Sequence, residues 1–540
     1  MNRKDLAGML EYAADLMEVL GEGEFRAKAY RNAARNLEQQ EADLNELAAR
    51  GFKGVPGVGP ALAPMLSEIV QTQEFPYLAE LEGHVPPGVL ELFRVQGLGP
   101  KRIRALWDNG INSLEELVRW AEQGKIRTLP GFGAKSEASL LEAARYALAN
   151  LRRVMLPVGL EVARLLLTDL ANAGLKAELA GSVRRGLETV GNVDLVVVGT
   201  PEQVRPVLGR YVEEVQGEVL LGRLEGLPLR VFCTPAGSFG SVLVQATGSR
   251  AWLEAQGPIP PSMASETEVF EALQLPFVPA YWREKEHIGL SAPETPLKPD
   301  QLRGLIHVHS TYSDGSATLR QMAEAAIAQG FEYMVICDHS QTAAYAGGLR
   351  EADVLRQWAE IEALNAELAP FRILRGIESD ILPDGSLDYP DELLARFEVV
   401  VGSLHAGLNL GQAEQTQRLL RALDNPYLSI LGHPSGRLIL RRKGAEADWD
   451  AVLERAAQNQ KVVEFNCSPY RLDLDWRLML AWRDRLHFSL GPDSHSVEGI
   501  ADIQYGLLFA LKAGLRPEQV VNTWPAERLL ALKKMDESAS

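Results

Sequence analysis

The 540-residue chain is poor in cysteine, and the few cysteines are widely spaced. Cys233, Cys337 and Cys467 form no Cys-x-x-Cys pair, so neither a disulfide framework nor a thiolate metal site is expected. The sequence also lacks an apolar run long enough to cross a membrane, and it does not open with a signal-peptide pattern. We therefore expect a cytoplasmic protein with no membrane partner.

Positive charge is also in short supply. The chain has 55 Lys and Arg against 72 Asp and Glu, which gives a net charge of −17 at pH 7. This balance argues against a uniformly basic nucleic-acid-binding protein, although a whole-chain sum says little about local patches. The length implies more than one domain, so acidic and basic domains can share the chain.

Histidine is scarce too, but its placement is uneven. Six of the nine histidines lie in the stretch 306–315 or where later short apolar runs of the C-terminal half end. The first of these stretches, 306–315, contains His307, His309 and Asp314. If 305–308 is a strand, its period of two places both histidines on one face. Asp314 lies in the Ser-Asp-Gly turn that follows, from which its carboxylate can reach the same place.

Further apolar runs along the C-terminal half end in metal-ligand residue types. These residues are His339, Glu378, His405, His433, Asp493 and His495. Helical patterns at 319–329, 353–368 and 449–459 lie between the runs, and this alternation favours a parallel α/β barrel. Functional groups gather at the C-terminal ends of barrel strands, so we expect these side chains to converge.

The motifs that carry these residues resemble one family closely. His-x-His-Ser-x-Tyr-Ser-Asp-Gly, Asp-His-Ser, Gly-Ile-Glu, Gly-Ser-Leu-His, Gly-His-Pro and Asp-Ser-His appear in the order found in PHP (polymerase and histidinol phosphatase) metallo-phosphoesterases. The resemblance implies three metal sites, which we list together: His307, His309, Glu378 and Asp493 would hold one ion, Glu378 would bridge to a second held with His405 and His433, and Asp314, His339 and His495 would hold a third.

Such a cluster would hold up to three ions, and mixed histidine and carboxylate ligands suit Mn or Zn. The ions would acidify a bound water and hold phosphate oxygens during hydrolysis. Arg437 and Lys443, just after Gly-His-Pro, are candidate phosphate contacts. An ordinary solvated basic loop is an equally good interpretation of these two residues.

The N-terminal half shows a repeated turn. The pattern predicts a helical DNA-binding domain over residues 1–82. It predicts a second, fingers-like DNA-binding region over residues 83–150. Three helix-hairpin-helix turns carry the glycine pairs Gly57 and Gly59, Gly97 and Gly99, and Gly131 and Gly133. Amide groups after such turns can bind a DNA phosphate, and Lys101, Arg102 and Lys135 could reinforce the second and third contacts. One of the three hairpins could be a packing module only.

Residues 151–291 resemble the nucleotidyltransferase palm of family X DNA polymerases, with a shortened thumb. In that family, residues at the positions of Gly181, Ser182 and Arg185 bind the triphosphate, and three carboxylates bind two metal ions. Here only Asp194 remains, because Asn192 and Pro228 stand at the other two positions. An amide binds Mg poorly and a proline side chain cannot bind it, so Mg or Mn is expected at the palm only if the palm is active.

The sequence also bears on lyase activity and on whether other acidic residues could restore the polymerase site. Met65, next to Pro64, stands where relatives with lyase activity carry a Schiff-base lysine. Glu178 and Glu225 are the acidic residues that could substitute for the missing palm carboxylates, but nothing in their spacing requires it. Polymerase and lyase activity are therefore both in question.

Over essentially its whole length the chain resembles the bacterial PolX family, with a degenerate polymerase site. The fold class implied is multidomain, α+β and α/β: a helix-hairpin-helix region, a palm, and a distorted PHP barrel over 300–540, joined by a linker at 293–299. The first hypothesis is a DNA-repair 3′-5′ exonuclease or 3′-end phosphoesterase with weak or lost polymerase activity. The alternatives are an active gap-filling polymerase and a small-molecule phosphate monoesterase tethered to DNA.

The expected partner is DNA with a gap or a 3′ end. Nucleoside triphosphates are a further candidate partner, and we expect the chain to be a monomer.

Overall fold

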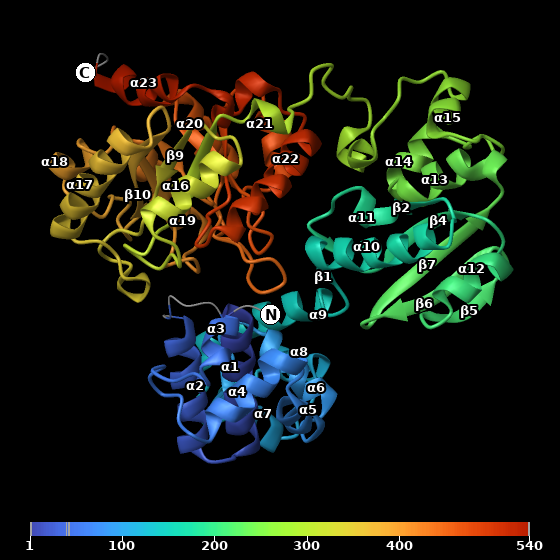
Figure 1. Ribbon diagram of the computed structural model, residues 1–540, viewed down its shortest axis with the longest axis horizontal. Helices are drawn as coiled ribbons and strands as arrows, with labels where there is room; N and C mark the ends of the chain where they lie inside the picture. Colours follow the sequence, from blue (N-terminus) through green and yellow to red (C-terminus); the bar gives the residue numbers. More distant parts are fainter. Residues whose placement is uncertain (1–2, 39, 41–43, 538–540) are drawn as a thin grey trace. The chain divides into compact units, whose positions relative to one another are not determined.

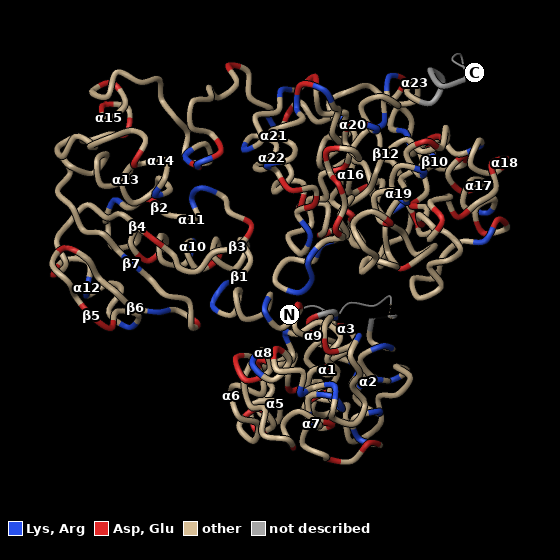
Figure 2. The backbone as a smooth tube through the Cα atoms, turned by 180° about the vertical axis from the view of Figure 1, so that it is seen from behind, with Lys and Arg blue, Asp and Glu red and all other residues tan. Residues whose placement is uncertain are grey.

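The computed structural model describes residues 3–38, 40 and 44–537. The chain divides into two compact units, Met1–Leu151 with Leu440–Arg442, and Arg152–Ile439 with Lys443–Ser540. None of the helices in the described ranges is long and apolar enough to cross a bilayer. Figure 2 shows acidic and basic residues interspersed along each unit, in keeping with the mixed composition.

The first unit is helical, as the sequence predicts (Figure 1). Its helices are α1 (Arg3–Leu20), α2 (Glu24–Glu38), α3 (Leu44–Ala49), α4 (Leu62–Thr72), α5 (Pro76–Gly83), α6 (Pro87–Glu91), α7 (Pro100–Asp108), α8 (Leu114–Glu122) and α9 (Ala134–Ala149). One apolar core joins them, with Leu10, Ala33 and Leu106 among its most buried residues. This single core explains why the first two predicted domains form one unit.

The three predicted hairpin turns share one backbone geometry. Gly57, Gly97 and Gly131 have φ values of 77°, 79° and 83°, which only glycine adopts without strain. The residue after each glycine donates its amide to the carbonyl three residues back, at 3.2, 3.1 and 3.2 Å. Helices α4, α7 and α9 begin just beyond these turns. The repeat seen in the sequence is therefore a repeat of structure.

The second unit begins with a five-stranded sheet in the order β2-β4-β7-β6-β5. Its strands are β2 (Ala177–Ala180), β4 (Val193–Val198), β5 (Val212–Gln216), β6 (Val219–Leu224) and β7 (Leu227–Thr234), and a separate pair is β1 (Val154–Met155) with β3 (Thr189–Val190). Strands β4 and β7 are parallel, and the other neighbours are antiparallel.

Helices cover both faces of this sheet. The helices of this part are α10 (Leu156–Asn172), α11 (Gly181–Arg184), α12 (Pro201–Leu208), α13 (Phe239–Thr247), α14 (Arg250–Gln256) and α15 (Glu266–Ala272). Leu195 shares a core with Leu166 of α10, whereas Val196 shares one with Leu243 of α13. Burial on both sides accounts for the unbroken apolar run of β4.

The rest of the unit is the predicted parallel barrel. Its strands are β8 (Gly304–Val308), β9 (Tyr333–Ile336), β10 (Arg372–Asp380), β11 (Val399–Ser403), β12 (Ile430–Leu431), β13 (Val462–Asn466) and β14 (Phe488–Gly491), paired in sequence order. All these pairs are parallel. A bridge between Val308 and Ser494 brings the last strand's end to the first, so the barrel is nearly closed.

Helices lie around these strands, as Figure 1 shows. They are α16 (Leu319–Ala328), α17 (Glu351–Glu367), α18 (Asp391–Leu394), α19 (Gln412–Leu423), α20 (Trp449–Gln458), α21 (Trp476–Trp482), α22 (Ile503–Lys512) and α23 (Ala526–Glu537). The three helical patterns predicted from the sequence correspond to α16, α17 and α20. The multidomain fold class is thus confirmed, whereas the residue boundaries 1–82, 83–150, 151–291 and 300–540 stay a prediction.

A buried cluster joins the sheet region to the barrel within the second unit. His287 stacks between Trp282 and Trp476, with ring centroids 4.0 and 5.2 Å away. Its Nε2 lies 2.8 Å from the carbonyl oxygen of Lys512. The Lys512 ammonium is buried and donates to the carbonyl of Arg185 at 2.9 Å. These contacts hold the segment that contains Trp282 and His287, which leads into the linker at 293–299.

This cluster predicts a pH dependence of stability. Burial lowers the pKa of His287 to about 4. The hydrogen bond with the Lys512 carbonyl and the charge of Glu284 oppose this shift, whereas the charges of Lys512 and Arg483 add to it. Because the folded state favours the neutral ring, stability is retained above pH 6.5 and falls by up to about 3 kcal/mol as pH falls toward 4. Urea unfolding of wild type and His287→Phe at both ends of this range measures the effect. A pH dependence that is the same in both proteins would rule it out.

Candidate metal centre

The first two predicted ligands lie at the C-terminal end of β8. His307 and His309 are fully buried, and their ring centroids are 5.3 Å apart. Simple strand alternation does not produce this arrangement, because the β8 to β9 register shifts between Ile306 and Val308 and His307 has a φ of 69°. His433 and Asp493 also have positive φ, at 20° and 52°. Such strained backbone is typical of functional sites.

A buried aspartate shapes the loop that follows. Asp338 Oδ1 accepts from the Ser310 amide at 2.8 Å and the Ser313 hydroxyl at 2.6 Å, and its Oδ2 accepts from the Ser310 hydroxyl at 2.6 Å. The serines of the motif thus tie the loop to the end of β9. This tie brings Asp314 to 3.2 Å from His495 Nε2 and 3.5 Å from His339 Nε2.

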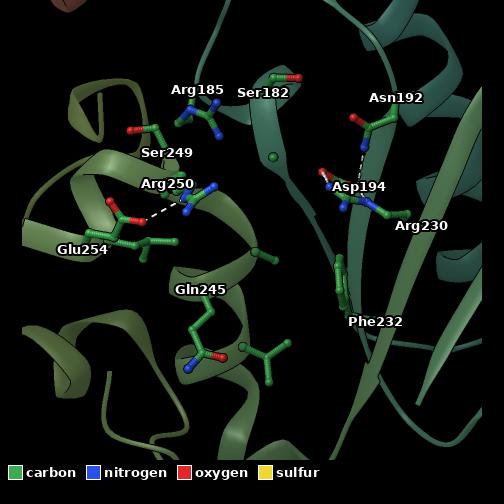
Figure 3. Close-up of a pocket in the computed structure, with 15 residues that line it drawn as sticks. Ser182, Arg185, Asn192, Asp194, Arg230, Phe232, Gln245, Ser249, Arg250 and Glu254 are labelled. Atoms are coloured by element: carbon green, nitrogen blue, oxygen red, sulfur yellow. Dashed lines mark hydrogen bonds and ion pairs between the residues drawn. The ribbon is translucent and has the colours of Figure 1, made fainter. Parts of the chain in front are cut away.

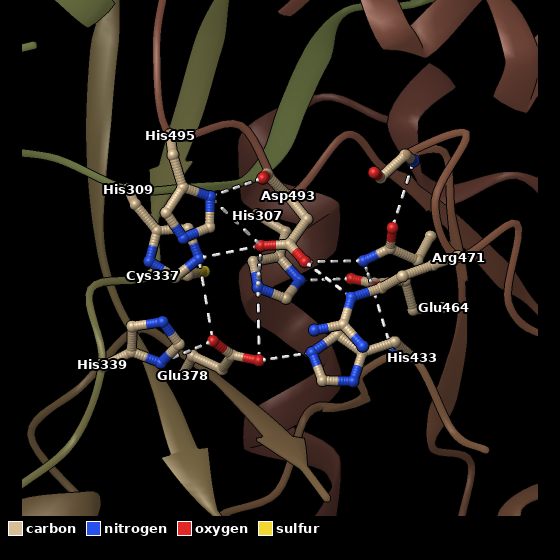
Figure 4. A network of polar contacts seen from close by, with 12 residues as sticks. His307, His309, Cys337, His339, Glu378, His433, Glu464, Arg471, Asp493 and His495 are labelled. Atoms are coloured by element: carbon tan, nitrogen blue, oxygen red, sulfur yellow. Dashed lines mark hydrogen bonds and ion pairs between the residues drawn. The ribbon is translucent and has the colours of Figure 1, made fainter. Parts of the chain in front are cut away.

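The structure brings all nine predicted ligand residues into one cluster, most of which is drawn in Figure 4. Four overlapping groups have ligand atoms within 4.8 Å of one another: His309, Asp314, His339 and His495; His307, His309 and Glu378; His307, His433 and Asp493; and His339, Glu378 and His405. These groups share members, so the division among three ions that the resemblance implies stays a prediction.

Glu378 lies at the centre of the cluster. Its Oε1 is 2.7 Å from His433 Nε2 and 3.2 Å from His405 Nε2, and its Oε2 is 3.0 Å from His339 Nδ1. Burial alone would raise the pKa of this carboxyl, but the charges on His405 and His339 lower it well below its ordinary value. An ionised, buried carboxylate with both oxygens among imidazoles suits a bridging ligand.

The cluster also leaves buried polar atoms without hydrogen bonds. Among the described residues, both ring nitrogens of His309, Nε2 of His307, Nδ1 of His433 and Oε2 of Glu378 make none. Buried polar atoms are nearly always satisfied, and exceptions need an explanation. Imidazole nitrogens and carboxylate oxygens that face one another fit divalent metal ions, which would satisfy these atoms.

Two carboxylates that the sequence analysis did not single out orient these rings. Glu464 Oε2 lies 2.5 Å from His307 Nδ1, and Asp380 Oδ1 lies 2.5 Å from His405 Nδ1. Each contact directs Nε2 of the ring toward the cluster, as outer carboxylates commonly do for metal-binding histidines. A Cβ at Gly491 would lie 2.5 Å from Glu464 Oε2. Glu464 lies within a further apolar run and Asp380 is two residues from Glu378, so the sequence pointed to both positions.

The cations near the cluster differ from those considered in the sequence. The guanidinium of Arg437 donates to the carbonyls of Arg471 and Leu472 and lies 3.2 Å from Asp475 Oδ2, so it supports a loop. The guanidinium of Arg471 has its Nε 3.4 Å from Asp493 Oδ2 and makes no hydrogen bond within the described chain. Figure 4 shows its guanidinium between Asp493 and His433. The role predicted for Lys443 stays a prediction.

The predicted palm site forms a separate cavity of about 560 Å³ (Figure 3). Asp194 is buried, and its two oxygens accept from Nε and Nη2 of Arg230 at 2.7 and 2.8 Å. Asn192 Nδ2 donates to the same carboxylate at 2.5 Å. The register pairs Asp194 with Arg230 on the neighbouring strand. The remaining carboxylate is therefore neutralised by a side chain of the protein.

The other residues predicted at the palm, Gly181, Ser182 and Arg185, line the same cavity, and Arg185 is already paired within the protein. Arg185 lies 2.8 Å from Glu284 Oε1 and donates to the Thr247 carbonyl at 2.6 Å. Gly181 has a φ of 63°, and a Cβ there would lie 2.2 Å from Asp194 Oδ2. The acidic residues that line the cavity are Asp194 and Glu254, and Glu254 pairs with Arg250 at 2.8 Å.

No further acid replaces the missing carboxylates in the described palm. Neither Glu178 nor Glu225 is among the residues that line the cavity, and Pro228 is not among them either. In the first unit, α4 contains no lysine, and Met65 accepts a contact from the Tyr30 hydroxyl at 3.4 Å. The folded structure therefore supplies no replacement for the missing palm carboxylates or for the missing lysine in α4.

Known domain families match both halves of the chain. A helix-hairpin-helix domain matches residues 1–75, a SAM-like helix-hairpin-helix tandem matches 89–145, and a PHP domain matches 306–468. The barrel and its cluster of histidines and carboxylates therefore define a PHP-domain protein, which also carries helix-hairpin-helix domains. The chain is 32% identical, over 99% of its own length and the whole of the relative, to "DNA polymerase/3′-5′ exonuclease PolX" of Bacillus subtilis (strain 168). It belongs to the PolX family.

The barrel half also has separate relatives. A "probable phosphatase" of Syntrophotalea carbinolica is 27% identical over 40% of this chain and 90% of the relative. Another, from Acetivibrio thermocellus, is 30% identical over 30% of this chain and 63% of the relative. Both similarities concern proteins named as phosphatases.

Proposed function

We propose that this chain is a metal-dependent DNA-repair enzyme whose PHP domain removes nucleotides or phosphate from DNA 3′ ends. The observation that carries the proposal is the convergence of nine ligand-type side chains around the buried carboxylate of Glu378. The relatives named as exonuclease and phosphatase support phosphoester hydrolysis as the reaction.

The residues of the cluster would hold up to three Mn or Zn ions, in the three sets that the resemblance implies. Bound ions supply an acidified water and neutralise charge on the phosphate. Glu464 and Asp380 keep Nε2 of His307 and His405 directed inward. We assign Arg471 to a non-bridging phosphate oxygen, because its donors face the cluster. Hydrolysis adds water across the P–O bond, and the leaving oxygen takes a proton.

The hairpins would hold the DNA. Gly57, Gly59, Gly97, Gly99, Gly131 and Gly133 shape the three turns, and Lys101, Arg102 and Lys135 follow two of them. Contacts to phosphates carry no sequence information. A gapped or 3′-ended duplex is therefore the proposed substrate, without a preferred sequence.

Salt dependence tests this proposal against a small-molecule phosphatase. We expect kcat/KM on a 3′-ended duplex to fall about tenfold or more between about 50 and 200 mM salt, because phosphate contacts release counterions. Hydrolysis of p-nitrophenyl phosphate should change little. The triple variant Lys101→Gln, Arg102→Gln and Lys135→Gln should flatten the duplex dependence. Equal salt dependence for both substrates would favour the monoesterase.

A gap-filling polymerase is the second candidate, because residues that match the nucleotidyltransferase signature, among them Ser182, Arg185 and Asp194, line one cavity. We propose instead that this site is catalytically silent. Two-metal catalysis needs several acidic ligands, whereas the one buried aspartate here is paired with Arg230. Primer extension with Mn that disappears in Asp194→Ala would establish the polymerase.

A further inference from the structure

Tyr345 places an exposed aromatic ring at the edge of the metal cluster. It is 74% exposed, although its ring centroid lies only 6.3 Å from that of His339. Most large side chains near the cluster are buried, among them Leu349 and Tyr389. An aromatic ring left in solvent beside a predicted ligand has no packing role, so it is free to contact a substrate.

The turn that carries Tyr345 is firmly anchored. It is the 3₁₀ turn Ala344–Ala346, in which Ala346 is buried, as is Ala343 just before the turn. Thr342 donates its hydroxyl to Asp380 Oδ2 at 2.6 Å and its amide to Asp388 Oδ2 at 2.7 Å. Asp380 also holds His405. The ring position is thereby tied to the position of the cluster.

The ring of Tyr345 approaches the cluster beside His339, with the two ring planes tilted by 54°. Within the described chain the hydroxyl makes no hydrogen bond. The residue thus combines an exposed aromatic ring with a position beside the predicted ligand His339.

We propose that Tyr345 determines substrate class by stacking on the 3′-terminal nucleobase, while the adjoining phosphate lies between Arg471 and the ligand cluster. In a nucleotide, one sugar separates the base from its 5′ phosphate, so one residue can hold each group at the same time. Stacking on a tyrosine tolerates any base, because every base offers a flat face. The inference rests on the proposed 3′-end hydrolysis and adds the part of the DNA that is recognised.

The test compares two duplexes that differ only at the 3′-terminal nucleotide, which either carries a base or is a tetrahydrofuran abasic analogue. We measure kcat/KM with Mn for wild type, Tyr345→Ala, Tyr345→Leu and Tyr345→Phe. Wild type and Tyr345→Phe should prefer the base-bearing end by roughly tenfold or more. The alanine and leucine variants should cleave both ends at similar rates. Leucine keeps apolar bulk, so it separates loss of the ring from damage to the turn.

Tyr470→Ala is the matched control, because Tyr470 is also exposed, at 51%, and lies next to Arg471 in the chain. It should keep the preference. Persistence of the preference in Tyr345→Ala and Tyr345→Leu, or its loss in Tyr470→Ala, would overturn the inference. Equal cleavage of both ends by wild type would overturn it as well and leave 3′-end hydrolysis standing. If wild type cleaves neither end, the proposed function itself fails.

Discussion

Replacing His307 and His309 together with alanine is expected to reduce hydrolysis of DNA 3′ ends by roughly 10³-fold or more. Both rings are fully buried in the cluster, and each belongs to two of the groups that can hold an ion. Their loss removes ligand atoms beside Glu378 and leaves that carboxylate without part of its compensating charge. Metal content by mass spectrometry should fall together with the rate, because the same atoms serve both.

His487→Ala is the matched control for this variant. His487 lies in the same domain, but it packs against Trp524 and belongs to none of the candidate metal groups. Metal content and hydrolysis should therefore stay at the wild-type level. DNA binding by the double variant should also persist, because the hairpins are in the other unit. A double variant that keeps its metal and its rate would exclude the cluster as the active site.

The Arg471→Met variant should lose roughly 10²- to 10³-fold in kcat/KM, the usual effect of removing one donor to a developing negative charge. Arg471 is not a metal-ligand type, so the metal content should not change. Its Nε is 3.4 Å from Asp493 Oδ2, and its remaining donors face the cluster without a partner in the described chain. Rates on a 3′-ended duplex and on bis(p-nitrophenyl) phosphate should fall in parallel, because both present a phosphate.

Arg477→Met is a suitable comparison for Arg471→Met. Arg477 lies in the same segment, but it pairs with Glu188 and Glu286. Its replacement should leave the rate within a few-fold of wild type, and Arg471→Lys should restore only part of the loss, since an ammonium lacks the guanidinium fork. A full rate in Arg471→Met would assign the phosphate contact to another group, with Lys443 the first to test.

The ligand cluster could be predicted from the sequence because each ligand sits in a short local motif. Strand ends of a parallel barrel meet at one edge, so finding the strands placed the ligands together. The backbone conformation at His307 was harder to predict. Strand alternation predicts a shared face with His309, whereas the structure achieves convergence with a register shift and a φ of 69°. Backbone strain of this kind depends on the surrounding fold.

Contacts between residues distant in sequence could not be predicted. The pairing of Arg230 with Asp194 depends on the register of β4 and β7, and that of Glu464 with His307 joins β13 to β8. Asn192 and Pro228 did indicate a weakened palm. They gave no sign that an arginine occupies the remaining carboxylate. The free ring of Tyr345 was likewise not visible, because exposure is a property of the folded chain.

The most direct test of the whole account uses a labelled gapped duplex with Mn, with and without nucleoside triphosphates. Wild type and the His307→Ala, His309→Ala double variant are compared on the same substrate. We expect the primer to shorten with wild type only, and never to lengthen when nucleotides are present. A primer that lengthens, and still does so with the double variant, would contradict the account, because the palm would then be an active polymerase despite Asn192 and Pro228.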